Sequence, residues 1–139
     1  MIHIAHRGNL TGSSDSENSP NQIDKCIVSG YEVEVDVWNV GGFYLGHDKA
    51  TYRVNIEWLR ERNQYLWIHA KNIHALHSLK DDFNTFGHDN DDYVLTSKGY
   101  IWVYPGKPLV PGCIAVMPER CDYSRDELSA CYGICSDFS

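Results

Sequence analysis

The feature that most restricts how this chain can fold is residues 32–37, where acidic and apolar residues alternate. In an extended strand successive side chains point to opposite faces, so Glu32, Glu34 and Asp36 share one face and three valines share the other. The valine face predicts contact with a core. The acidic face has two interpretations: a solvated face of an ordinary sheet, or part of a functional cluster.

Short polar motifs near this stretch favour the functional cluster. His6-Arg7-Gly8 ends a first apolar segment, Glu17-Asn18-Ser19 follows a loop-like stretch, and His47-Asp48 follows the short apolar residues 43–45. Each motif falls at or near the end of a strand-like segment. In parallel sheets built from βαβ units, strand ends are where enzymes place their reacting groups.

In this order, the motifs H-R-G, E-N-S, E-x-D and H-D resemble the glycerophosphodiester phosphodiesterase family, one of the phospholipase C-like phosphodiesterases built on TIM barrels. The resemblance is densest over residues 2–48. Further on, residues 67–71 are similar to an E-x-K strand of the family, with His69 in place of the glutamate. Residues 133–137 resemble the closing strand of the family.

The length of 139 residues is that of one domain. A TIM barrel typically needs about 250 residues and seldom fewer than about 200. Helical spacing is found near residues 20–29, 55–63, 73–80 and 124–131, and eight strand-like segments are marked by Ile2, Val33, Trp67, Asn84, Val94, Trp102, Ile114 and Ile134. The sequence therefore predicts an α/β domain over residues 1–139: a reduced (β/α)8 TIM-like barrel in which several helices of the second half are missing.

Composition narrows the function classes. The net charge of -7 argues against a protein that binds nucleic acid by neutralising phosphates. No uncharged apolar stretch reaches the roughly 18 residues expected of a membrane-spanning helix, and the amino terminus does not read as a signal peptide. Five cysteines without C-x-x-C spacing predict free thiols in a reducing compartment rather than a zinc knuckle or a complete disulfide framework. We expect a soluble, cytoplasmic protein.

The resemblance implies roles for the histidines and the basic residues. Cleavage of a phosphodiester needs one group to accept a proton, one to donate a proton, and positive charge beside the phosphate oxygens. His6 and His47 match the two catalytic histidines of the family, and the sequence does not tell the acid from the base. Arg7 and Lys71 are expected to bind phosphate; an ion pair with the carboxylates is the structural alternative.

The resemblance also implies a divalent cation, Mg²⁺ or Ca²⁺, held by Glu34 and Asp36. Two ways of completing its coordination stay open. If His69 is a ligand, the site should favour a transition ion, because imidazole suits such ions better than it suits Mg²⁺ or Ca²⁺. If His69 is not a ligand, Glu17 of the E-N-S motif must help complete the shell.

The predicted function is therefore a metal-dependent phosphodiesterase that cleaves glycerophosphodiesters or related phospholipid headgroup esters by paired histidine acid–base catalysis. Its partner would be a small phosphodiester. The presence of both histidines favours this enzyme, whereas the missing carboxylate at position 69 favours an inactive module that binds phosphate or a headgroup. A structural protein folded around a cation is a third interpretation. The enzyme predicts that these side chains converge on one mouth: His6, Glu34, Asp36, His47, His69 and Lys71.

Overall fold

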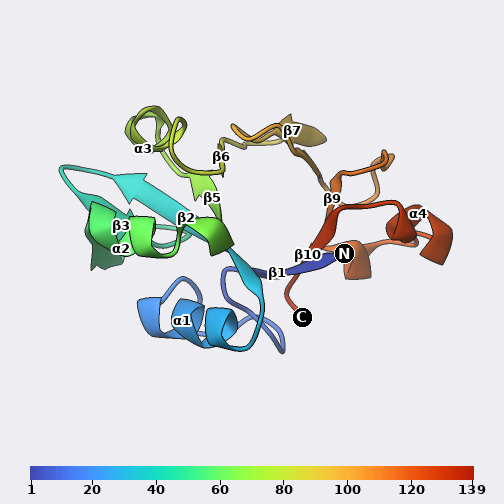
Figure 1. Cartoon of the computed structure of the whole chain (residues 1–139), viewed down its shortest axis with the longest axis horizontal. Helices are drawn as coiled ribbons and strands as arrows, with labels where there is room; N and C mark the ends of the chain where they lie inside the picture. The colour runs from blue at the N-terminus through green and yellow to red at the C-terminus, as the bar shows by residue number, and fades with distance from the viewer.

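The computed structural model describes residues 1–139, and all ten strands belong to one sheet (Figure 1). The first half contributes β1 (Ile2–His6), β2 (Glu32–Asn39), β3 (Phe43–Leu45), β4 (Tyr52–Val54) and β5 (Leu66–Ala70). The second half contributes β6 (Thr85–Phe86), β7 (Tyr93–Leu95), β8 (Ile101–Val103), β9 (Ile114–Val116) and β10 (Gly133–Ser136). The helices are α1 (Pro20–Val28), α2 (Ile56–Glu61), α3 (Ile73–Leu79) and α4 (Arg125–Ser129), with 3-10 turns η1 (Asn63–Tyr65) and η2 (Pro118–Arg120).

Strand β2 is the centre of the arrangement. Strand β5 pairs in parallel along one edge of β2, while β1 and then β3 share the other edge. The register sets His6 opposite Glu34 and Asp36 opposite His69. Because these strands are parallel, their carboxyl ends meet at the same end of the sheet, and so do the polar residues found there.

The predicted (β/α)8 TIM-like barrel is wrong. The chain forms a mixed sheet in which β3 is antiparallel to β2 and to β4, and β7 is antiparallel to β8. The tight turns at Gly41-Gly42 and Lys98-Gly99 explain two of these pairings, because such short connections join only antiparallel strands. Strands β6 and β7 are not paired in a ladder. Near them, the N–H of Ser97, which follows β7, donates one backbone hydrogen bond to the carbonyl of Thr85 in β6 (2.8 Å).

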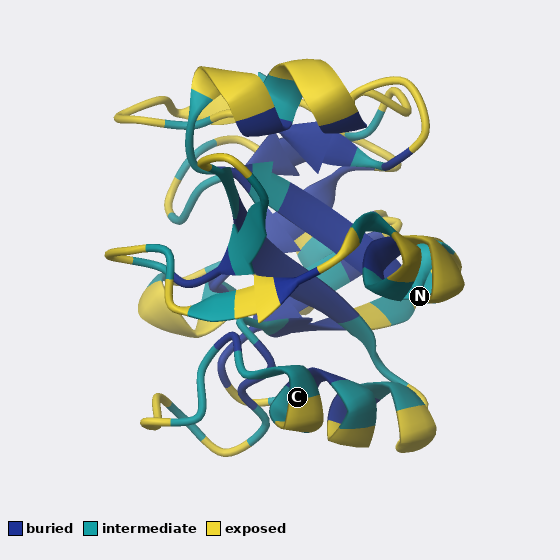
Figure 2. Cartoon of the chain, turned by 90° about the vertical axis from the view of Figure 1, so that its left-hand side faces the viewer, coloured by how far each residue is buried: buried dark blue, intermediate teal, exposed yellow.

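The alternating pattern of β2 is confirmed, but both of its faces are buried. Val33, Val35 and Val37 are fully buried in the largest apolar cluster, together with residues of α1 and α3. On the other face Glu34 and Asp36 are 2% and 1% exposed, so a solvated acidic face is excluded. Figure 2 shows buried residues concentrated in the strands and exposed residues on the outer faces of the helices.

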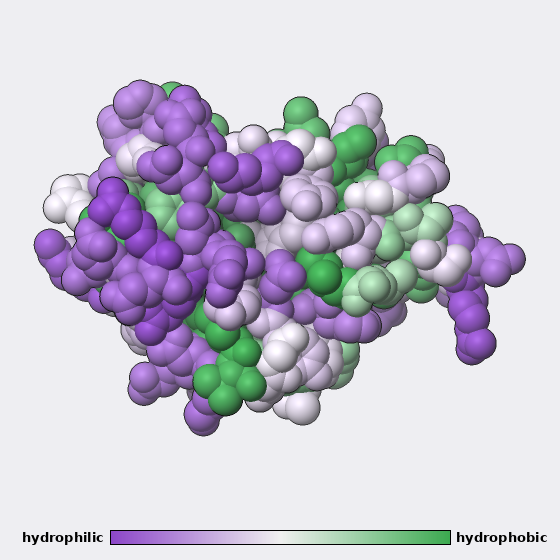
Figure 3. Space-filling view, viewed as in Figure 1, coloured by the Kyte–Doolittle hydropathy of each residue, from purple (hydrophilic) through white to green (hydrophobic).

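The helices begin where their capping residues predict. Helix α1 has Ser19 as N-cap and Pro20 in its first turn, and α4 has the capping box formed by Ser124 and Glu127. No helix combines the length and the apolar character that crossing a bilayer requires. The face in Figure 3 is mostly hydrophilic, and its hydrophobic residues lie in separate patches.

Candidate functional site

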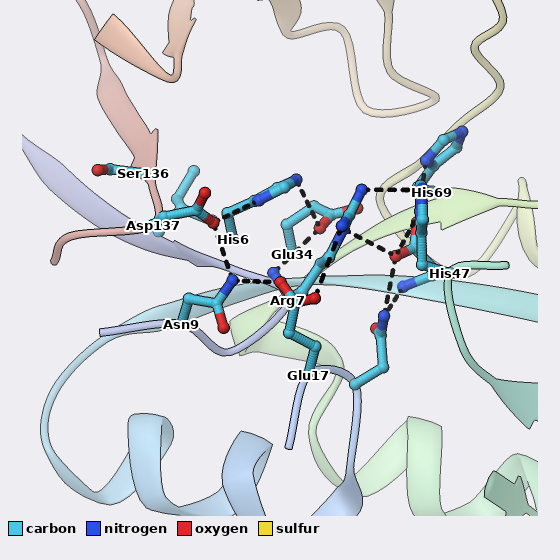
Figure 4. A network of polar contacts seen from close by, with 12 residues as sticks. His6, Arg7, Asn9, Glu17, Glu34, His47, His69, Ser136 and Asp137 are labelled. Carbon is cyan, nitrogen blue, oxygen red and sulfur yellow. Dashed lines mark hydrogen bonds and ion pairs between the residues drawn. The ribbon is translucent and has the colours of Figure 1, made fainter. Parts of the chain in front are cut away.

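Side chains from the carboxyl ends of β1, β2 and β5, together with the segment after β3, meet in a pocket of about 240 Å³. Figure 4 shows how they lie toward one another. Of the residues singled out from the sequence, the pocket is lined by His6, Arg7, Glu34, Asp36, His47 and His69. Larger hollows of about 780, 660, 540 and 430 Å³ lie elsewhere on the surface, and each contains at most one histidine. The hollow of about 430 Å³ adjoins this site and shares His47 with it.

Two of the residues expected at the site lie beside the pocket instead of lining it. The Glu17 carboxylate accepts a hydrogen bond from the Asn9 amide and lies 3.7 Å from the guanidinium Nη1 of Arg7. Lys71 follows β5, and its N–H donates to the Val37 carbonyl (2.8 Å). Its charge is near enough to Glu34 to oppose the rise in the pKa of that carboxyl.

The Asp36 carboxylate is the point where most of the contacts meet. It lies 3.0 Å from the His69 Nδ1, and it accepts a hydrogen bond from the Asn18 Nδ2 (2.9 Å). The Asn18 Oδ1 in turn accepts from the Asp36 N–H (2.9 Å). Asn18 has φ 63°, a left-handed conformation that asparagine adopts more readily than most residues. This reciprocal pair anchors the E-N-S loop to β2.

Arg7 crosses the site from the end of β1. It also has a left-handed backbone (φ 56°), and its N–H donates to the Glu34 carbonyl (2.9 Å). The Arg7 Nε lies 3.5 Å from the Asp36 carboxylate, and Nη2 lies 3.1 Å from the His47 Nε2. Because arginine can only donate, the His47 Nε2 accepts this bond, which leaves His47 neutral with its proton on Nδ1.

His47 is placed by the turn after β3. The Gly46 N–H donates to the Asp36 carbonyl (3.1 Å), and the Gly46 carbonyl accepts from the Trp38 indole (2.7 Å). Gly46 has φ 155°, and a Cβ there would collide with the Lys49 carbonyl. The turn therefore requires glycine, and it brings His47 Nδ1 to 3.7 Å from the Asp36 carboxylate.

His6 has a carboxylate partner that the sequence reasoning missed. Its Nδ1 lies 2.7 Å from the Oδ1 of Asp137, the residue that follows β10, and the Asn9 Nδ2 donates to the same oxygen (2.9 Å). Burial alone would raise the pKa of Asp137, but the bonds from His6 and Asn9 outweigh it and lower that pKa. Asp137 is therefore ionised and holds the proton of His6 on Nδ1, which leaves Nε2 facing the pocket, 3.9 Å from Glu34.

The two buried carboxyls of β2 have pKa values that are shifted in opposite directions. Burial, together with the charge of Asp36, raises the pKa of Glu34 well above its usual range. Burial also acts on Asp36, but the nearby imidazoles of His47 and His69 and the Asn18 amide lower its pKa. A second negative charge at Glu34 therefore needs a cation close by.

Glu34, Asp36 and His69 form the group of side chains suited to hold that cation. One ligand atom from each of them lies within 4.8 Å of the others, and Glu17 is not part of the group. Two carboxylate oxygens and one imidazole nitrogen fit a divalent ion. The site thus has the ligands for a metal beside two histidines and an arginine.

The opposite wall of the pocket is apolar and comes from the second half of the chain. It contains Phe86, Trp102, Tyr104, Pro105, Val116 and Met117, and His88 and Arg120 complete the lining. His88 stacks on the Tyr104 ring at 3.8 Å, and Arg120 lies 3.5 Å from the Asp137 Oδ2. The sequence reasoning did not identify His88, Arg120 or Asp137 as site residues. Each of them follows a short strand, and this position is the feature of the sequence that could have indicated them.

No family model, no curated protein and no solved structure matched the chain.

Proposed function

We propose that this chain is a metal-dependent phosphodiesterase that acts on glycerophosphodiesters or related headgroup esters. The observation that carries the proposal is that two histidines, an arginine and a carboxylate–imidazole cluster share one pocket. These are the groups that proton transfer and phosphate binding require. The order of the motifs H-R-G, E-N-S, E-x-D and H-D supports the same reaction.

In this proposal His6 is the base. Asp137 holds its Nδ1 proton, so Nε2 is the atom that accepts a proton from the attacking oxygen. Water or a neighbouring hydroxyl of the substrate is the attacking group. When Arg7 binds the nonbridging oxygens of the phosphate, it releases the Nε2 of His47. His47 then takes up a proton from solvent at Nε2, with the Asp36 carboxylate 3.7 Å from its Nδ1 to stabilise the imidazolium, and it donates that proton to the leaving oxygen.

Glu34, Asp36 and His69 would hold the divalent ion. When bound, such an ion supplies positive charge beside the phosphate oxygens. The imidazole of His69 shifts the preference of the site from Mg²⁺ or Ca²⁺ toward a transition ion such as Zn²⁺.

The apolar wall sets the size of the substrate. A pocket of about 240 Å³ is smaller than the roughly 300 Å³ at which pockets for drug-sized ligands begin. A phosphodiester with a small alcohol on each side fits this space better than one that carries acyl chains. Phe86, Trp102 and Met117 would cover the carbon atoms of the alcohol.

The first expected result concerns Asp137. Asp137→Asn should lower the rate of phosphodiester cleavage by about 10- to 100-fold, because the amide no longer stabilises the charged imidazole of His6. Steady-state rates on a panel of glycerophosphodiesters measure the effect. Asp122→Asn, at an exposed carboxylate close by in sequence, is the matched control and should retain the wild-type rate. Equal rates for both variants would remove Asp137 from the mechanism.

A second expected result concerns the metal. Calorimetric titration with Mg²⁺, Ca²⁺, Mn²⁺ and Zn²⁺ should show saturable binding to the wild type with a preference for a transition ion. His69→Glu should shift the preference toward Mg²⁺ or Ca²⁺ by at least about tenfold. Glu17→Ala should change the affinities little, because Glu17 lies outside the ligand group.

These titrations also test the proposal as a whole. If the wild type binds none of the four ions, the metal site is refuted. If it binds an ion and phosphate but cleaves no member of the panel, the chain is the inactive binding module and not an enzyme.

A further inference from the structure

Two of the five cysteines are in contact. The Sγ of Cys113, just before β9, lies 3.8 Å from the Sγ of Cys131, near the start of β10. The two side chains are separated by 18 positions in sequence, and both residues are buried, at 1% and 7% exposure. Both thiols are free, so the two sulfur atoms are in contact without a disulfide bond between them.

Backbone hydrogen bonds next to the two cysteines hold their segments side by side. The Tyr132 N–H donates to the Cys113 carbonyl (2.8 Å), and the Gly112 N–H donates to the Ala130 carbonyl (2.9 Å). To reach the length of a disulfide bond, about 2.05 Å, the two sulfurs need to approach by roughly 1.8 Å. Rotation about one Cα–Cβ bond moves a sulfur atom by a distance of this order, so the backbone need not be rebuilt.

The other three cysteines have no thiol partner. Cys26 and Cys135 lie in two different apolar clusters, and the Cys26 thiol donates to the Gly8 carbonyl (3.2 Å). Cys121 is half-buried, with the Pro118 carbonyl as its neighbour. The one group of potential metal ligands contains no cysteine, so a metal site does not explain the contact between Cys113 and Cys131.

Helix α4 packs beside the pair: the Cys131 Sγ lies 3.8 Å from the Glu127 carbonyl, and Leu128 contacts the apolar cluster that contains both cysteines. This five-residue helix ends two residues before Cys131 and contains no buried residue, so it opens at a low cost in free energy. Burial, with the neighbouring Cys113 thiol adding to it, raises the pKa of Cys131 to about 12. The buried thiol is therefore slow to react, and local opening of α4 would expose Cys131 to an oxidant.

We propose that Cys113 and Cys131 are a reversible dithiol–disulfide couple that exchanges with small-molecule disulfides such as oxidised glutathione. The Cys131 thiolate attacks one sulfur of the oxidant and releases one small thiolate. Cys113 then attacks the Cys131 Sγ of the mixed disulfide and releases the second. The two leaving thiolates take up the two protons, so one protein disulfide forms while one small disulfide is reduced to two thiols.

The couple joins the two ends of a segment that also reaches the pocket. Val116, Met117 and Arg120 line the pocket and lie between the two cysteines in sequence. The disulfide would restrict this segment in the unfolded chain and so stabilise the folded state. None of these steps depends on the proposed phosphodiesterase activity.

The test uses the folded wild-type protein in buffers with increasing ratios of oxidised to reduced glutathione. After alkylation of the remaining thiols, peptide mapping should find Cys113 linked to Cys131, while Cys26 and Cys135 stay alkylated. Proteolytic cleavage after Tyr132 separates Cys131 from Cys135. The melting temperature of the oxidised form should exceed that of the reduced form by roughly 10 °C.

Two matched variants complete the test. Cys113→Ala should remove both the cross-link and the shift in melting temperature, and Cys121→Ser should retain both. The mapping of the wild type decides the proposal even if Cys113→Ala fails to fold. The proposal is overturned if the only oxidised product is a mixed disulfide at Cys121, or if the pair stays reduced at the most oxidising ratio.

Discussion

Replacing His6 or His47 by alanine is expected to lower the rate of phosphodiester cleavage at least about a hundredfold, the usual scale for loss of a general acid or base. His6 should give the larger loss, because its Nδ1 is already held by Asp137 and its Nε2 faces the pocket. The folded state should survive both changes, since the two side chains are 17% and 39% exposed and carry little of the core.

The measurement pairs initial rates on a glycerophosphodiester panel with circular dichroism of each variant. His74→Ala is the matched control, because this histidine is exposed on α3 and lies outside the pocket. It should retain the wild-type rate. Unchanged rates in both His6→Ala and His47→Ala would contradict acid–base catalysis at this site and favour the binding module.

Asp36→Ala is expected to destabilise the protein by about 3–5 kcal/mol, the range for removing one partner of a buried ion pair. The Asp36 side chain is 1% exposed and compensates the buried donors of Asn18, His69 and Arg7. Without it, Asn18 loses the partner that anchors its loop to β2, His69 loses a hydrogen-bonding partner, and Arg7 loses a counter-charge. Urea unfolding at neutral pH measures the difference as a lower midpoint with a similar slope.

The pH dependence gives this prediction a second signature. The pKa of Asp36 is lower in the folded state than its usual value of 3.8, so its stabilising contribution is present above that value and is lost as the pH falls below it. The difference in the free energy of unfolding between wild type and Asp36→Ala should therefore become smaller at acid pH. Asp122→Ala, at an exposed carboxylate, should differ from wild type by less than about 0.5 kcal/mol at neutral pH. If both variants lose a similar amount of free energy of unfolding, the contacts of Asp36 do not stabilise the fold as predicted.

Much of the local structure could be predicted from the sequence because it depends on neighbouring residues. The alternation of residues 32–37 predicts a strand with a buried valine face, and β2 has that face. Ser19 before Pro20, and Ser124 three residues before Glu127, predict the starts of α1 and α4. Polar residues at strand ends likewise indicated part of the pocket lining, including His6, Asp36 and His47, but not His88 or Arg120.

The relative direction of the strands and their pairing partners could not be predicted from these local patterns. A period of two identifies a strand but not its partner, so β7 was counted as one more parallel strand although its turn makes it antiparallel to β8. The resemblance to a barrel family then supplied eight parallel strands, whereas the sheet is mixed and β6 and β7 form no ladder.

Only the tertiary structure decided which distant residues meet. Asp137 reaches His6 across 131 positions of sequence because β1 and β10 pair in parallel, and Cys113 contacts Cys131 because β9 and β10 do. The burial of Glu34 and Asp36 was likewise not visible in the alternation, since it depends on side chains of other segments that lie over them, such as Arg7 and Asn18. Local patterns determine elements through short-range contacts, whereas these pairings arise from packing between segments that the sequence keeps far apart.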